Sequence, residues 1–242
     1  MTMPRKVAVE ILDGLEQTDP AAERSRRDLR RIHRAMGTRS ILLRALRQLT
    51  PPGRHAASIR VLELGAGDGT LMLGVARAMA PWWPPVELTL LDRQALVAGE
   101  TIAGFAGLGW TTDVDVVDAL DWARSSSSNQ TARWDLIIAN LFLHHFEGAQ
   151  LAALLGAVAG GSDRFVACEP RRDWIALGGS HLVGAIGAGA VTRTDAVLSV
   201  HAGFRGNELS AEWATHGVDW RVQEYRAGPF SHCFCAEQTE AG

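Results

Sequence analysis

The sequence predicts an α/β fold: a doubly wound, mostly parallel seven-stranded sheet with helices on both faces. Three observations support this prediction. Apolar runs of strand length alternate with helical patterns between residues 58 and 170, which is typical of parallel strands joined by helices. The first run ends in a turn with three glycines and leads directly into a helical pattern, as in doubly wound sheets. The length of 242 residues suits one large domain with a sizeable core.

The predicted elements follow one another along the chain. Residues 1–52 are expected to form an N-terminal helical cap, because apolar positions in residues 20–50 recur at helical spacing, with a break near Gly37. Residues 53–242 are expected to form the main domain. Its strands are expected at 58–64, 86–92, 114–119, 134–140 and 164–170, and its helices at 70–80, 95–105 and 147–159.

The last third of the chain departs from this alternation. A Gly- and Ala-rich stretch at about 174–217 is expected to be a helical insertion that covers a pocket. Residues 218–225 and 230–237 then suit an antiparallel pair that closes the sheet. Earlier in the chain, the segment SSSSNQ at 125–130 is expected to be a surface loop.

Composition argues against several classes of protein. The net charge of -3 does not indicate a chain dominated by nucleic-acid binding, so nucleic acid is not an expected partner. The longest apolar stretch is interrupted too often for a bilayer span of roughly 20 residues, and no cleavable signal is visible. We therefore expect a cytoplasmic protein with no membrane contact. The three cysteines fit neither a disulfide framework nor a zinc spacing. A homodimer is left open.

Acids flank the glycine-rich turn, and they indicate the charge of its ligand. Glu63 ends the strand and Asp68 lies within the turn, in the stretch VLELGAGDGT at 61–70. Bare amides at a helix N-terminus bind an anion such as pyrophosphate, but two carboxylates would repel it and suit a cation. This stretch resembles motif I of the class I methyltransferase family. The resemblance, which covers about residues 55–170, implies that S-adenosylmethionine is the cofactor, since it carries an ammonium and a sulfonium.

Further candidates stand at the ends of later strands, where the ligands of open α/β sheets bind. An acid at Asp92 can accept both hydroxyls of a ribose, although a helix N-cap or a nicotinamide enzyme gives the same pattern. The resemblance implies that Asp118 and Ala119 contact adenine, with Asp121 as a competitor, and that Asn140 lies beside the methionine moiety. The residues expected at the cofactor are Glu63, Gly65, Ala66, Gly67, Asp92, Arg93, Asp118, Ala119, Asn140 and Leu141.

Two histidines are the candidates for catalysis. His144 and His145 follow the fourth strand, close to where the methyl group should point. One of them is expected to act as a general base toward a phenol or enol, or to orient the acceptor, while at least one is structural because adjacent residues on a turn point apart. No acid trio for magnesium is visible, and no metal is expected.

Residues in the cap, in the insertion and after the fifth strand are the candidates for substrate binding. Glu169 and Arg171 sit together at the end of the fifth strand, where they are alternatively a pair that orients a loop. An arginine-rich helix such as the one around His33 is also typical of a solvated face. The residues expected to bind substrate are His33, Arg171, Arg193 and His201.

The C-terminal half carries a second resemblance. The stretches CEPRRDWIAL, VTRTDAVLSVHAGFRGNELS and AGPFSHCFCAE look like those of small bacterial methyltransferases associated with type III polyketide synthases. This implies O-methylation, or else C-methylation, of an aromatic or polyketide-type hydroxylated acceptor, with S-adenosylhomocysteine as the product. Two other classes remain open. One is an NAD(P)-dependent oxidoreductase, and the other is a non-catalytic module that binds a cofactor or RNA through the basic helix at 24–47.

Overall fold

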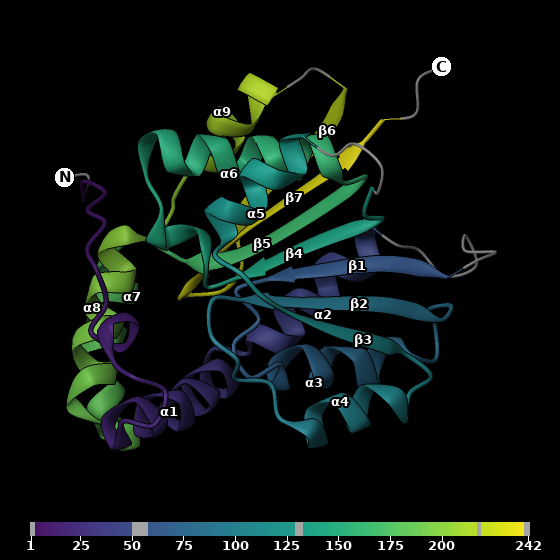
Figure 1. Ribbon diagram of the computed structural model, residues 1–242. Coiled ribbons are helices and arrows are strands. Elements are labelled where there is room, and N and C mark those ends of the chain that lie inside the picture. The colour runs from purple at the N-terminus through teal and green to yellow at the C-terminus, as the bar shows by residue number, and fades with distance from the viewer. Residues whose placement is uncertain (1–2, 50–57, 129–132, 217–218, 240–242) are drawn as a thin grey trace.

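Seven strands form one sheet in the computed structural model, which describes residues 3–49, 58–128, 133–216 and 219–239. Their order is β3-β2-β1-β4-β5-β7-β6 (Figure 1). The first five strands are parallel, and β7 runs antiparallel to both β5 and β6. The strands are β1 (Ile59–Leu64), β2 (Val86–Asp92), β3 (Thr111–Val116), β4 (Leu136–Asn140), β5 (Arg164–Pro170), β6 (Trp220–Arg226) and β7 (Ser231–Gln238). The predicted fold class is confirmed.

Helices cover both faces of the sheet. One face carries α2 (Thr38–Leu49), α3 (Thr70–Met79) and α4 (Gly99–Ala106), and the other carries α5 (Ala119–Ser128), α6 (Gly148–Gly161) and α9 (Glu208–Trp213) (Figure 1). Successive side chains of β1 serve the two cores: Val61 packs with the α2–α3 side and Leu62 with the α5–α6 side. Apart from Arg60 and Glu63, the strand is apolar because both of its faces are buried.

Several further helices gather at the carboxyl ends of the strands, on the left of Figure 1. They are α1 (Pro20–Met36), α7 (Trp174–His181) and α8 (Ala190–Ala202), with the short 3₁₀ helices η1 (Leu12–Gly14) and η3 (Val183–Ile186). The N-terminal segment, residues 3–14, lies along α8: Lys6 N donates to the carbonyl of His201 at 3.0 Å, and Arg5 Nε to that of Ala202 at 2.8 Å. Within the described residues, no helix combines the length and apolar character that crossing a bilayer requires.

Three elements, α4, β3 and α5, differ most from the expected ones. Helix α4 begins at Gly99, four residues late, and β3 ends at Val116, which leaves Asp118 in the turn before α5. Helix α5 continues to Ser128, so the serines predicted to form a loop are helical as far as that residue. Ala119 and Ala123 hold α5 in the core beside α6, and serine opposes a helix only weakly. The rest of that segment and the expected domain boundary at residue 52 lie outside the described residues.

Gly203 allows the insertion to approach the sheet closely. A Cβ there would lie 2.2 Å from the carbonyl oxygen of Pro170 at the end of β5. We expect Gly203→Ala to lower the free energy of unfolding by about 1–3 kcal/mol through overpacking, as measured by urea denaturation. Gly160→Ala is the matched control, because no atom lies within 4 Å of a Cβ at this position in α6. The control should raise the free energy of unfolding by about 0.5–1 kcal/mol; native stability in Gly203→Ala would contradict the close approach.

Candidate functional site

The strand order reverses at the boundary between β1 and β4, and open α/β sheets bind ligands beyond the strand ends at such a point. Glu63 pairs with Ile138 and Leu64 with Ala139 in the parallel register of these two strands. The glycine-rich turn and Asn140 therefore leave the sheet side by side. The structure thus brings together two of the strand ends that the sequence marked as a binding site.

Two glycines shape the turn after β1. Gly65 and Gly67 have φ angles of 68° and 58°, in the left-handed region that glycine adopts without steric cost. A Cβ on Gly65 would lie 2.3 Å from the ring of Phe142, whereas one on Gly67 would meet no atom within 4 Å. Gly65 is thus required for packing against the β4 end, and Gly67 borders open space.

Buried polar atoms without hydrogen-bond partners surround the turn. They include Glu63 Oε2, Asn140 Oδ1 and His33 Nδ1. Burial, reinforced by the charges of Asp68 and Asp92, raises the pKa of Glu63 to about 8. Burial lowers the pKa of His33 to about 4, so its imidazole is neutral at pH 7. Unsatisfied buried polar groups are costly, and a ligand that donates hydrogen bonds and carries positive charge would satisfy the two oxygens.

Asp68 has a different role from the one expected. Its Oδ2 accepts from Arg30 of α1 at 2.7 Å, and its Oδ1 accepts from the backbone N–H and hydroxyl of Thr70. Burial alone would raise the pKa of Asp68, but the hydrogen bonds from Thr70 and Arg30 lower it. Asp68 therefore fastens α1 to the turn. Of the two acids in the motif, Glu63 is the one with an unpartnered buried oxygen.

Asp92 ends β2 and supports the same turn. Its Oδ2 accepts from Gly67 N at 2.9 Å and its Oδ1 from Gln94 N at 2.9 Å. It is not a helix N-cap, because α4 is preceded by Ala98. A carboxylate has about four acceptor positions, so two remain for hydroxyl donors. Its assignment to a ribose stays a prediction.

The other expected cofactor residues follow the ends of β2, β3 and β4, and two of them have partners within the protein. Arg93 pairs with Asp13 of η1 at 3.0 Å. Asp118 accepts from Leu120 N at 2.8 Å and so begins α5, and Ala119 is buried. Leu141 has a φ angle of 49°, a costly conformation for a residue with a branched side chain. Such strain is concentrated at functional sites, and here it turns the chain out of β4.

Each of the two adjacent histidines faces a carboxylate. His144 is buried, with Nδ1 2.8 Å from Glu169 Oε2 and Nε2 3.4 Å from Glu10 Oε1. Burial alone would lower the pKa of His144, but Glu10 and Glu169 raise it to about 9. His145 is 24% exposed, and its Nδ1 lies 3.3 Å from Asp13 Oδ2. Glu10 and Asp13 were not predicted from the sequence, because nothing in the N-terminal segment indicates a contact so distant along the chain.

The substrate-binding candidates separate into two groups. His33 lies on α1, where the charge of Asp68 in the turn acts on it. Arg171 instead forms an ion pair with Asp173, while the Glu169 expected beside it accepts from the backbone N–H groups of Phe142, Leu143 and His144. The side chain of Arg193 is exposed on α8, and His201 contributes its carbonyl to Lys6. Among the described residues, these contacts place none of Arg171, Arg193 and His201 at the turn.

Comparison with known proteins identifies the fold. No protein-family model matches the sequence, and no match was found among curated proteins. The solved plantazolicin methyltransferase BamL, in complex with a triazolic desmethylPZN analog and SAH, is 12% identical, with a TM-score of 0.62 over 95% of this chain and 93% of that chain. An O-methyltransferase family protein from Burkholderia thailandensis is 17% identical, with a TM-score of 0.53 over 85% of this chain and 59% of that chain.

The carbon methyltransferase of CurJ is also similar. It is 16% identical, with a TM-score of 0.53 over 85% of this chain and 54% of that chain. The chain thus spans little more than half the length of two of these structures. These likenesses, together with the strand order, show that the chain has the class I methyltransferase fold.

Proposed function

We propose that this protein is an S-adenosylmethionine-dependent methyltransferase that modifies a small hydroxylated acceptor. One observation carries the proposal: the buried, unpartnered oxygens of Glu63 and Asn140 flank a left-handed glycine turn at the strand reversal. A ligand that is cationic and rich in donors fits such a place. The similar solved structures are described as methyltransferases, and one of them holds SAH.

In this proposal, each residue of the site contacts a different part of the cofactor. Glu63 accepts from the ammonium group, Asn140 lies beside the methionine moiety, and the free acceptor positions of Asp92 take the ribose hydroxyls. Asp118 and Ala119 remain the proposed adenine contacts. The cofactor supplies a methyl group on a sulfonium, and the protein aligns the acceptor with it; such alignment can contribute roughly 7–11 kcal/mol.

The acceptor is proposed to be aromatic or of the polyketide type, methylated on oxygen or, as the second choice, on carbon. This rests on the resemblance of the C-terminal stretches and on the cap over the strand ends (Figure 1). Cytoplasmic location is proposed on sequence grounds alone. The test is transfer of label from methyl-labelled S-adenosylmethionine to a panel of hydroxylated aromatic polyketides. Labelled product supports the proposal, whereas cofactor binding without turnover of any acceptor would favour a non-catalytic module.

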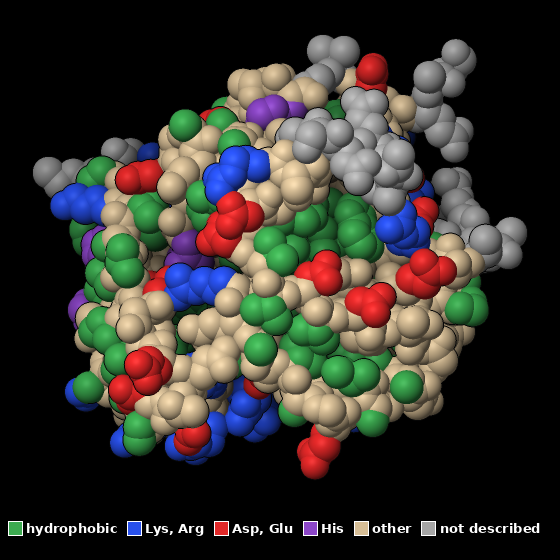
Figure 2. All heavy atoms as spheres, in the orientation of Figure 1, with side chains coloured by type: hydrophobic (Ala, Val, Ile, Leu, Met, Phe, Trp, Pro, Cys, Tyr) green, Lys and Arg blue, Asp and Glu red, His purple; other side chains and the backbone are tan. Residues whose placement is uncertain are grey.

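The basic helix does not favour RNA binding. Arginines of α1 pair with acids: Arg30 with Asp68 and Arg31 with Asp28. Figure 2 shows basic side chains at the lower left with acidic side chains among them, not a continuous basic patch. Nucleic-acid surfaces instead concentrate positive charge. A small molecule therefore remains the proposed partner.

Of the two catalytic candidates, the geometry favours His145 as the base. Both ring nitrogens of His144 face carboxylates in a buried site, whereas only Nδ1 of His145 has such a partner. We expect His145→Gln to lower kcat about 100-fold or more and to leave S-adenosylhomocysteine affinity unchanged, measured by steady-state kinetics and calorimetry. His144→Gln should chiefly lower the free energy of unfolding. A folded, inactive His144→Gln beside a fully active His145→Gln would assign the base to His144.

A further inference from the structure

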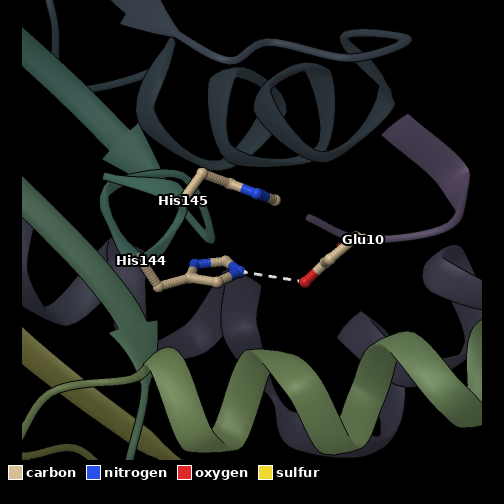
Figure 3. A group of neighbouring side chains, drawn as sticks. All are labelled: Glu10, His144 and His145. Atoms are coloured by element: carbon tan, nitrogen blue, oxygen red, sulfur yellow. Dashed lines mark ion pairs between the residues drawn. The ribbon is translucent and has the colours of Figure 1, made fainter. Parts of the chain in front are cut away.

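Glu10, His144 and His145 point one ligand atom each into a common space (Figure 3). These atoms all lie within 4.8 Å of one another. Two imidazoles and one carboxylate are a donor set that zinc and related divalent ions bind, at about 2.0–2.2 Å from each ligand atom. The atoms are close enough for small side-chain rotations to bring them to that distance. Glu10 comes from the N-terminal segment, and the histidines come from the 3₁₀ helix η2 (Leu143–His145) after β4.

Glu169 orients the imidazole of His144 for metal coordination. Its Oε2 lies 2.8 Å from His144 Nδ1, which leaves Nε2 facing Glu10 at 3.4 Å. Glu169 is fully buried and also accepts from the backbone N–H groups of Leu143 and His144. A carboxylate that holds the far nitrogen of a histidine fixes the tautomer and orientation of metal-binding imidazoles. The chain therefore supplies both a ligand set and the support behind it.

The surrounding charges favour a cation. Besides Glu10 and Glu169, Asp13 lies 3.3 Å from His145 Nδ1, and Asp195 accepts from Ile11 N and Leu12 N beside Glu10. Two arginines also reach this region. Arg93 pairs with Asp13, and Arg5 donates to the carbonyls of Ala202 and Phe146. Because Arg93 offsets the charge of Asp13, the carboxylates of Glu10 and Glu169 are the ones left beside His144, and a divalent ion would balance their charge.

We propose that Glu10, His144 and His145 bind a divalent first-row transition metal ion of the zinc type, which clamps the N-terminal segment to the end of β4. This inference goes beyond the proposed function and does not depend on it. The sequence predicted no metal, because it offers no set of three acids for magnesium. Imidazoles instead suit zinc, copper, iron or nickel. A coordinated nitrogen cannot also accept a proton, so occupancy by the ion and use of His145 as a base exclude each other.

The test is zinc binding by the full chain after treatment with a chelator, in competition with a chromogenic zinc indicator and without S-adenosylmethionine. We expect one zinc ion per chain, with affinity about 10-fold to 100-fold weaker in Glu10→Gln and His145→Gln. His181→Gln is the matched control, because this exposed histidine lies at the end of α7, outside the cluster. Its zinc affinity should equal that of the native protein.

A second measurement examines the clamp itself and does not require the histidine variants to fold. Zinc should slow proteolysis within residues 3–19 in the native protein and have no such effect in Glu10→Gln. Native protein that takes up no zinc at micromolar concentration would overturn the proposal. Equal zinc affinity in the native protein and both cluster variants would also overturn it. Neither result would decide whether the protein transfers methyl groups, which is measured separately by label incorporation.

Discussion

Glu63→Gln is expected to stabilise the protein near pH 8 while weakening its binding of S-adenosylhomocysteine. The pKa of Glu63 is raised to about 8 in the folded chain from an ordinary 4.5, by burial first and then by Asp68 and Asp92. The folded state therefore binds an additional proton between these two values. Glu63 should therefore lower the free energy of unfolding as pH rises through this range, by about 1.4 kcal/mol per pH unit, and glutamine should remove this contribution while leaving that of His144, whose pKa is raised to about 9.

Whereas Glu63→Gln should raise stability near pH 8, it should lower the affinity for S-adenosylhomocysteine. Loss of a charge-assisted hydrogen bond of about 1.5–3 kcal/mol would weaken binding by roughly 10-fold to 100-fold. Urea denaturation from pH 5 to pH 8 and calorimetry with S-adenosylhomocysteine measure the two effects. Glu87→Gln is the control, because its carboxylate is exposed at the start of β2, and it should change neither quantity. A Glu63→Gln protein with native affinity would remove this acid from the binding site.

Asp92→Ala is expected to have the larger effect on binding. The carboxylate holds Gly67 N and Gln94 N, and in the proposed function it also accepts two ribose hydroxyls. Losing two charge-assisted bonds of about 1.5–3 kcal/mol each should weaken binding of S-adenosylhomocysteine by at least about 100-fold. Calorimetry measures the affinity. Loss of the turn contacts should also lower the free energy of unfolding by about 1–3 kcal/mol.

A matched control is available on the neighbouring strand. Asp115 pairs with Leu91 in the β2–β3 register and is exposed. Asp115→Ala should retain native affinity. If Asp92→Ala remains folded and binds S-adenosylhomocysteine as tightly as the native protein, the carboxylate serves the turn alone and the ribose assignment is wrong.

The strand framework was predictable because its signals are local. Strand β5 occupies Arg164–Pro170, as expected, since an apolar run that is buried on both faces identifies a central parallel strand. The candidate site was predictable for a related reason: Asp92 and Asn140 end their strands and Glu63 is one residue from the end of its strand, and parallel strands bring their carboxyl ends to one edge. Position along the strand was sufficient to group them.

Side-chain partners were less predictable, because they depend on contacts between distant segments. Asp68 was expected to face a ligand, yet Arg30 of α1 pairs with it. Arg171 was weighed as the partner of Glu169, yet Glu169 holds His144 instead. Glu10 showed no pattern at all in the sequence. Charged residues in a cap can form several alternative pairs, and only the packing of the cap on the sheet selects among them.

The identity of the nucleoside that stabilises the native chain tests the central claim most directly. Thermal denaturation should be measured with S-adenosylmethionine, S-adenosylhomocysteine, NAD and NADP in parallel. The turn flanked by Glu63 predicts a rise in melting temperature with the first two, lost in Asp92→Ala, and none with the nicotinamide cofactors. A rise with NAD or NADP and none with S-adenosylmethionine would contradict the proposed function and favour an oxidoreductase.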